Sequence, residues 1–256
     1  MLASGKVDEQ GIKTLIEEMG MDAVPALLDV LAESQDRSVR RRLFDALIGM
    51  GPVVGERAFE RLANGPWFVL RNMLALLQRL ERLPPAFNPQ PFLTHADERV
   101  RREAFPLALR RGSRDRVLVG ALADADERMV RMALAEIQER VPDPVLPTLV
   151  NRVVRSEERP PDVRAAGIKV LARSRSPLAL NTLLEITTAG RTLLGRPRLA
   201  SASTDVLTAL RVLAQVWADR EEVKDVLDQA ARSKDPDIRG AVHLTSSSLG
   251  PMGVEP

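Results

Sequence analysis

Apolar residues recur along most of the chain at the spacing of an amphipathic helix. Val39, Leu43, Ala46 and Leu47 follow one another at steps of one to four residues, and the segment 100–107 repeats this arrangement. Residues three and four apart share one face of an α-helix, so these side chains form an apolar stripe. The pattern predicts helices over most of the sequence.

The helical pattern is also repeated. DERVRREAF at 97–105 returns as DERMVRMAL at 126–134, and each contains an aliphatic residue followed by Arg. The same pair is found at Val39-Arg40, Leu70-Arg71, Val100-Arg101, Val130-Arg131, Val163-Arg164 and Ile238-Arg239. The Arg-to-Arg steps are 31, 30, 30, 33 and 75 residues, and a degenerate copy at 204–217, with Val206 in place of Arg, occupies the last gap. Seven units with a period in the thirties predict a helical repeat array.

Each unit is expected to contain two helices. The second begins near the aliphatic-Arg pair, and Asp36, Asp97 and Asp235 stand four residues before an Arg, where they can cap the helix start. Glu127 and Pro160 occupy the matching places in two other units. The first helices are predicted at 23–32, 52–63, 116–124, 144–154, 178–188 and 221–231.

This pattern resembles a known family. A first helix containing Pro, as in AVPALLDVL and VLPTLV, then a turn with Asp, then Val-Arg opening the second helix, is similar to the HEAT-like repeats, in the bacterial variety also found in phycobilin-lyase-type repeat proteins. The resemblance covers about residues 20–243. It implies an all-α fold, an α-solenoid of about seven stacked two-helix repeats forming a right-handed superhelix, with a curved binding surface.

The expected organisation has three parts. The repeat array spans 21–244; residues 1–20 hold a helix that is either a cap or the remnant of a further repeat; and 245–256 form a disordered tail rich in Ser, Gly and Pro. We expect no strand. Residues 83–92 are too rich in proline for a full first helix, Pro106 should kink its helix, and 189–203 read as an insertion.

The amino-acid composition limits how the core can be packed and which reactive groups are present. Tyr is absent and the 256 residues include only two Trp and six Phe, so Leu, Val and Ala must fill the core, as suits packed helices. The absence of Cys excludes disulfides and thiol chemistry. No apolar run is long enough to cross a bilayer and the start lacks the apolar core of a signal peptide, so we expect a cytoplasmic protein without membrane contact.

No group of residues suggests catalysis. His95 and His243 are the only histidines, and neither is followed by Glu as a HEAT-like di-iron site would require. The chain also lacks a Gly-rich phosphate loop and a GxSxG elbow. We therefore expect no enzymatic activity, no cofactor and no metal site.

Charge is distributed unevenly. Residues 1–36 carry a balance of −6, residues 37–116 carry sixteen Arg against eight acids, and the remainder is balanced. This basic block is either a set of solvated helix faces or a surface that meets an acidic partner. We expect a non-enzymatic scaffold that binds a protein or peptide with an acidic surface along its concave side; the alternative is nucleic-acid binding through 37–116. The identity of the partner and the oligomeric state stay open.

The repeated arginines have two interpretations. The family resemblance implies a ladder of hydrogen bonds from each Arg to the Asp of its own or a neighbouring turn. Alternatively, part of the series is exposed in the groove and binds phosphates or acidic side chains. The expected members of the ladder are Arg40, Arg71, Arg101, Arg131, Arg164 and Arg239 with Asp36, Asp97 and Asp235.

Four residues are candidates for partner binding. Arg41, Arg102 and Arg111 are expected to face solvent within the basic block. Trp67 follows Gly-Pro and has apolar neighbours, so its ring is expected to be largely buried, with the alternative that it is exposed and anchors a partner. Trp217 is expected in the core.

Overall fold

The computed structural model describes residues 9–191 and 197–243, and these residues divide into two compact units. The N-terminal unit extends to Val117 and the C-terminal unit begins at Leu118. The expected tail at 245–256 and the first eight residues lie outside the described residues.

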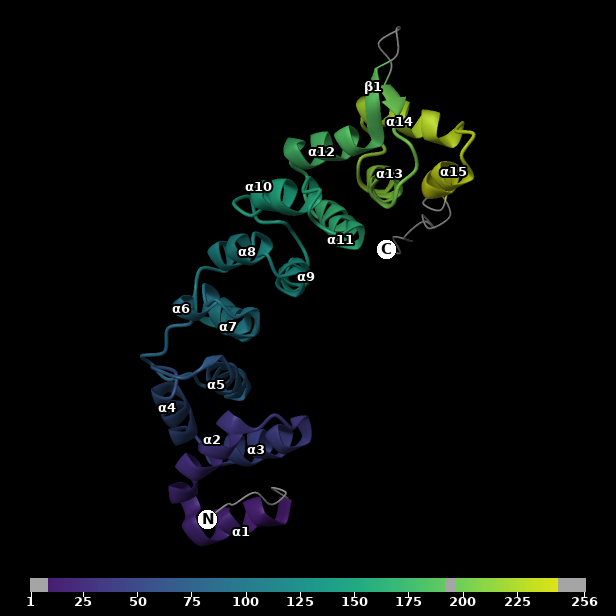
Figure 1. Ribbon diagram of the computed structural model, residues 1–256. Coiled ribbons are helices and arrows are strands. Elements are labelled where there is room, and N and C mark those ends of the chain that lie inside the picture. Colours follow the sequence, from purple (N-terminus) through teal and green to yellow (C-terminus); the bar gives the residue numbers. More distant parts are fainter. Residues whose placement is uncertain (1–8, 192–196, 244–256) are drawn as a thin grey trace, which may run out of the picture. The chain divides into compact units, whose positions relative to one another are not determined.

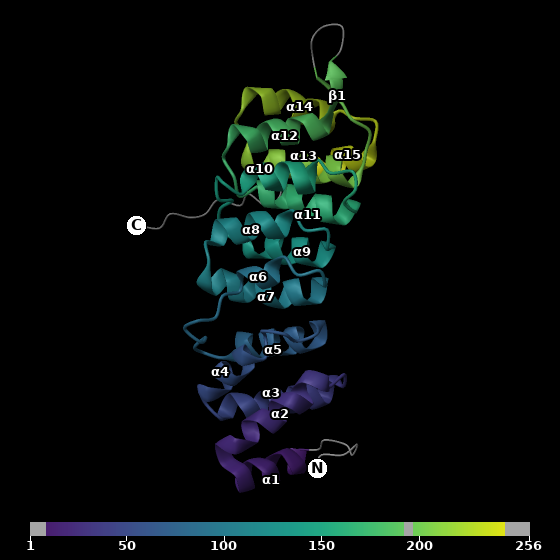
Figure 2. The same ribbon diagram turned by 60° about the vertical axis from the view of Figure 1, so that its left-hand side comes forward.

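The N-terminal unit is helical. Its elements are α1 (Glu9–Met19), the short 3-10 helix Gly20–Asp22, α2 (Ala23–Glu33), α3 (Arg37–Gly49), α4 (Val53–Glu60), α5 (Trp67–Arg79), α6 (Gln90–Leu93) and α7 (Glu98–Arg111). Helix α5 packs against both α2 and α7, and Figures 1 and 2 show α4 beside α5 and α6 beside α7. The second helices of successive sequence units, α3, α5 and α7, therefore lie in chain order. Helix α8 (Arg114–Leu122) spans the unit boundary.

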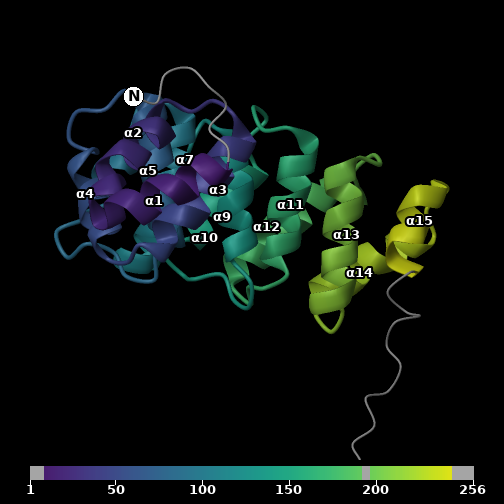
Figure 3. The same ribbon diagram turned by 90° about the horizontal axis from the view of Figure 1, so that it is seen from below.

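The C-terminal unit continues with paired helices. Its elements are α9 (Glu127–Glu136), α10 (Leu146–Thr148), the π-helical turn Leu149–Val154, α11 (Pro161–Leu171), α12 (Pro177–Thr187), β1 (Thr188–Arg191), β2 (Pro197–Leu199), α13 (Thr204–Val216), α14 (Glu221–Ala231) and α15 (Pro236–His243). Helix α11 packs against α9 and α13, and α13 against α12 and α15. Figure 3 shows α13, α14 and α15 as neighbours.

Helices occur where the apolar pattern predicts them. The predicted first helices correspond to α2, α4, α8, the α10 segment, α12 and α14, and the aliphatic-Arg pairs fall in the second helices. The proline-rich stretch 83–92 supports only the short α6, as expected. Helix α7 continues through Pro106 without a break.

The expectation that no strand is present is wrong. Strands β1 and β2 form an antiparallel hairpin that pairs Thr188 with Leu199. It lies within the segment read as an insertion between α12 and α13. Gly190 has a φ of 97°, a conformation that favours glycine. The strands were missed because their sequence shows no period-two alternation of apolar residues.

Aspartates cap several second helices. The Asp36 carboxylate accepts hydrogen bonds from the amides of Ser38 and Val39, and that of Asp97 accepts from Arg99. Asp235 does the same at the start of α15. Helix α9 is capped by Asp126 rather than Glu127, because Glu127 is already the first residue of the helix.

The core is aliphatic, as the composition suggests. Val100 of α7 and Val130 of α9 are both fully buried, as are most leucines of the second helices. Trp217 is 3% exposed, which confirms its place in the core. Both units therefore have an aliphatic core.

Candidate functional site

Four of the repeated arginines bind main-chain oxygens near their own helix start, and one of them is Arg164, whose Nη1 donates to the Arg159 carbonyl over 2.7 Å. In Arg40, Arg101 and Arg239, Nη1 donates to the carbonyls five and six residues earlier, over 2.6–3.2 Å. These carbonyls belong to the turn that precedes the helix in which each arginine lies, between the two helices of one sequence repeat. The guanidinium therefore stabilises that turn through hydrogen bonds to its carbonyls, and this role needs no aspartate.

Arg131 and Arg164 pair with aspartates, but with Asp162 and Asp205 instead of the predicted Asp36, Asp97 or Asp235. Arg131 Nη2 lies 2.8 Å from the Asp162 carboxylate, and Arg164 Nε lies 2.7 Å from that of Asp205. Both aspartates are in the first turn of the next second helix, where the helix dipole favours negative charge. These two ion pairs, both in the C-terminal unit, join successive second helices of that unit.

Arg71 has a different environment. Its Nε and Nη2 donate to Asn72 Oδ1, over 3.2 and 2.8 Å. Asn72 is 2% exposed and its amide donates to the carbonyls of Leu31 and Ala32 at the end of α2. Burial and the neighbouring Arg40 lower the pKa of Arg71. A neutral amide that is itself fixed therefore orients this partly buried cation.

Two guanidinium groups lie over the ring of Trp67. The Cζ atom of Arg99 is 3.4 Å and that of Arg71 5.5 Å from the ring centroid. Arg99 also pairs with Asp97 at 2.7 Å, and this hydrogen bond lowers the pKa of the Asp97 carboxyl to about 2. The Trp67 side chain is half-buried, and its ring makes cation–π contacts with both arginines. The more exposed aromatic ring belongs to its neighbour Phe68, at 36%.

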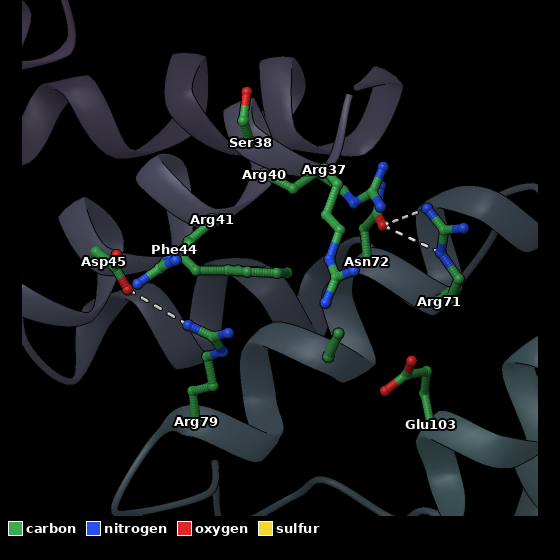
Figure 4. Close-up of a pocket in the computed structure, with 11 residues that line it drawn as sticks. Arg37, Ser38, Arg40, Arg41, Phe44, Asp45, Arg71, Asn72, Arg79 and Glu103 are labelled. Carbon is green, nitrogen blue, oxygen red and sulfur yellow. Dashed lines mark hydrogen bonds and ion pairs between the residues drawn. The ribbon is translucent and has the colours of Figure 1, made fainter. Parts of the chain in front are cut away.

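These side chains line two adjoining pockets. The first, which we call the arginine pocket, has a volume of about 890 Å³ and lies among α3, α5 and α7 (Figure 4). The second, the Trp67 pocket, measures about 620 Å³ and shares Arg40 and Arg71 with the first. The arginine pocket is lined by Arg37, Ser38, Arg40, Arg41, Phe44, Asp45, Arg71, Asn72, Ala75, Arg79 and Glu103. The Trp67 pocket is lined by Ala32, Glu33, Ser34, Gln35, Arg40, Trp67, Phe68, Arg71 and Arg99.

Positive charge in the arginine pocket is only partly neutralised. Asp45 pairs with Arg79 at 3.3 Å (Figure 4). Burial raises the pKa of the second acid, Glu103, to which Gln78 donates a hydrogen bond. Arg37 and Arg41 are exposed, and neither has a hydrogen-bonding or ion-pair partner for its side chain within residues 9–191 and 197–243. The pocket can therefore attract an anion.

Two of the four predicted partner-binding residues line a pocket, and the other two contact other parts of the protein. Arg41 lines the arginine pocket and Trp67 the adjoining one. The expectation that Arg102 faces solvent is wrong, because its side chain is 19% exposed and lies 3.4 Å from Glu98. Arg111 is exposed, but it donates to the carbonyls of Leu83, Pro84 and Pro85 and so holds the proline-rich loop.

Sequence analysis missed several lining residues. Arg37 was not a candidate, although it lies four residues before the predicted Arg41 on α3, so their shared face could have been recognised from spacing. Nothing in the sequence indicated that Asn72 would orient Arg71, because its partners are the carbonyls at the end of α2, about forty residues earlier. Phe68 was treated only as an apolar neighbour of Trp67.

Other arginines of the basic block are engaged elsewhere. Arg57 pairs with Glu60 and Arg61 with Asp29. Arg110 donates to the carbonyls of Gln78, Leu80 and Glu81 after α5. These contacts stabilise helix ends and loops, whereas Arg82 and Arg116 are exposed outside the pockets.

Within the described ranges, no cluster of His, Asp and Glu has the composition of a metal site, and no helix has the length and apolar character needed to span a membrane. Neither a model of a known protein family nor a curated protein sequence matches the chain.

Proposed function

We propose that this protein is a HEAT-like repeat protein, a right-handed α-solenoid of about seven repeats, that acts as a non-enzymatic scaffold. In this proposal the arginine pocket binds an acidic segment of a partner protein or peptide. The observation that carries it is the pair of exposed arginines on α3, Arg37 and Arg41, which line a pocket beside Arg71 without a carboxylate partner in the described chain. A cytoplasmic location stays a prediction.

The chemistry of the pocket supports an acidic ligand. A guanidinium presents planar donors that match a carboxylate in a bidentate arrangement. Arg71 is already oriented by Asn72, so less conformational freedom is lost when a ligand binds. Exposed Arg37 and Arg41 would accelerate encounter with an acidic partner. The pocket also lies on the second helices, which a HEAT-like array would present on its concave side.

The distribution of charge favours a peptide over a nucleic acid. A duplex offers a long row of phosphates and requires many accessible cations along its path. Arg57, Arg61, Arg110 and Arg111 instead make contacts within the protein. The basic block thus offers a local site more readily than an extended track.

Binding of a fluorescein-labelled oligoglutamate peptide, followed by fluorescence anisotropy, tests the proposal. We expect the double variant Arg37→Glu/Arg41→Glu to weaken binding at least about tenfold, equivalent to about 1.4 kcal/mol. The matched control is Arg82→Glu/Arg116→Glu, which makes the same change in charge at exposed positions of the basic block outside both pockets. Its affinity should stay close to that of the parent.

Two results would contradict this assignment. Equal weakening in both double variants would show that net charge, and not the pocket, attracts the peptide. Tight binding of random duplex DNA that falls steeply with salt, together with no binding of oligoglutamate, would favour the nucleic-acid alternative. Both variants change exposed residues, so their unfolding transitions should match the parent's closely.

A further inference from the structure

The combined charge of the two pockets exceeds what one carboxylate can neutralise. Their lining contains six arginines, at positions 37, 40, 41, 71, 79 and 99, and three acids, Glu33, Asp45 and Glu103. With all of these ionised, the excess is three positive charges, and it is two once Asp97, which pairs with Arg99, is counted. A phosphomonoester carries close to two negative charges at neutral pH and three strong acceptor oxygens. Its charge matches the pocket better than that of a single Asp or Glu.

The Arg71 side chain lies where the two pockets meet, and hydrogen bonds hold its guanidinium in place. The carbonyls at the end of α2 hold the Asn72 amide, and Asn72 Oδ1 in turn holds Arg71 through two nitrogen atoms. The pKa of Arg71 is lowered by burial and by the positive charge of Arg40 and, more weakly, Arg99. A multiply charged anion placed here would relieve the repulsion among these cations.

The Trp67 pocket adds an apolar wall beside the cations. Phe68 is 36% exposed, and its ring meets that of Trp67 edge to face with centroids 5.8 Å apart. Because Arg40 and Arg71 line both pockets, an anion and an apolar side chain of one peptide could occupy them together.

We propose that the preferred ligand is a segment carrying a phosphorylated serine or threonine in the arginine pocket, with a neighbouring apolar side chain against Phe68. This inference rests on the proposed function, since it specifies which acidic segment the pocket binds. Arg71 supplies the remaining Nη1 and Nη2 hydrogens of its fixed guanidinium, since Nε and one Nη2 hydrogen already bind Asn72, and Arg37 and Arg41 contact the phosphoryl oxygens from α3.

Three labelled peptides separate this inference from the broader proposal. They share glutamate-rich flanks and one leucine, and differ at one position beside it, which is phosphoserine, glutamate or serine. We expect the phosphoserine peptide to bind about tenfold more tightly than the glutamate peptide. Equal binding of these two would overturn the phosphoryl preference and leave the acidic-segment proposal intact. Failure of all three to bind would overturn both.

Variants assign the preference to the site. Arg71→Lys keeps the positive charge but loses the planar fork, so it should weaken both peptides and weaken the phosphoserine peptide more, which lowers the ratio of the two affinities severalfold. Arg116→Lys, outside both pockets, is the control and should leave both affinities unchanged. If Arg71→Lys destabilises the fold, Arg37→Lys offers the same comparison at an exposed position. An unchanged ratio of the two affinities in well-folded Arg71→Lys and Arg37→Lys would overturn the inference.

Two further arms test the source of the phosphoryl group and the apolar wall. Inorganic phosphate should displace the phosphoserine peptide only at concentrations far above the peptide's dissociation constant, and displacement at comparable concentrations would assign the site to free phosphate instead. Phe68→Ser should weaken the leucine-containing phosphopeptide severalfold and spare a version with glycine in place of leucine. Equal effects on both peptides would contradict the role of the apolar wall.

Discussion

The arginines of the two units have different partners. In the C-terminal unit, Arg131, Arg155 and Arg164 reach carboxylates of Asp162, Glu185 and Asp205, which lie in later helices. In the N-terminal unit, Arg40 binds carbonyls and Arg71 an amide, and both line pockets with exposed Arg37 and Arg41. A repeated arginine thus joins neighbouring helices where a carboxylate faces it; elsewhere it binds carbonyls of its own turn, as Arg40 and Arg239 do, or the Asn72 amide, as Arg71 does.

One sequence position accounts for part of this difference. Asp162, the partner of Arg131, lies two residues before the next repeated arginine, Arg164. In the N-terminal unit the matching residues before Arg71 and Arg101 are Val69 and Arg99. An apolar residue and a like charge therefore stand where the C-terminal unit has a neutralising acid, so Arg40 and Arg71 meet no acid at these positions.

The largest expected effect tests whether each unit buries the valine before its repeated arginine in its own core. Val100→Asp in the N-terminal unit and Val130→Asp in the C-terminal unit each place a charge at a fully buried position, so each should cost at least about 3 kcal/mol of unfolding free energy. Urea unfolding followed by circular dichroism measures this. The control Ala135→Asp, at an exposed position of α9, should cost far less. A Val130→Asp variant as stable as the parent would contradict the assigned packing.

A smaller effect should distinguish paired from unpaired arginines. Arg164→Ala leaves the Asp205 carboxylate, which is 19% exposed, without its cation and should cost about 2 kcal/mol. Arg37→Ala removes an exposed side chain without a partner in the described ranges and should change stability by less than about 0.5 kcal/mol. The same unfolding measurement compares them. Equal costs would remove the distinction between the two units.

Converting one unit to the pattern of the other sharpens the comparison. Arg99→Asp places an acid where Asp162 stands in the C-terminal unit, so it should partly neutralise Arg71 and lower oligoglutamate affinity by about tenfold. The new acid lies in the first turn of α7, where the helix dipole favours it. Anisotropy titration checks the affinity. The control Asp162→Asn, in the other unit, should leave it unchanged, and an Arg99→Asp variant that binds like the parent would refute the explanation.

The smallest effect concerns the cap of α7. The Asp97 pKa of about 2 lies below the ordinary value of 3.8, so ionised Asp97 stabilises the folded state above about pH 4. This contribution is lost as the pH falls through 2. Asp97→Asn keeps a capping side chain without the charge, so its stability should depend less on pH between 4 and 2. Thermal unfolding across this range provides the measurement, and identical pH profiles would contradict a charged cap.

The sequence predicts the helices better than the site. The aliphatic-Arg pairs and the capping aspartates are local signals, so α3, α7 and α15 begin where they were expected. The hairpin β1–β2 was missed because its pairing joins residues across the segment read as an insertion. Local spacing could place Arg37 beside Arg41, but Asn72, which orients Arg71, depends on contact with the end of α2.

The same reasoning explains why the candidate arginines differ. Arg41, Arg102 and Arg111 have similar local sequences that are rich in Arg, and a Phe stands three residues after both Arg41 and Arg102. Arg111 is fixed by carbonyls of the proline-rich loop about twenty-seven residues earlier, a contact that no local pattern encodes. Distinguishing a bound guanidinium from a free one therefore requires the packing of separate helices.

The most direct measurement of the contrast between the units is a spectrum of the arginine Nε–Hε groups in isotope-labelled full-length protein. Each resonance is assigned by an Arg→Lys variant, and oligoglutamate is then added. We predict that the resonances of Arg37, Arg41 and Arg71 shift while those of Arg131 and Arg164 stay in place, because the latter already face carboxylates. Larger shifts at Arg131 and Arg164 than at the three pocket arginines would contradict the account.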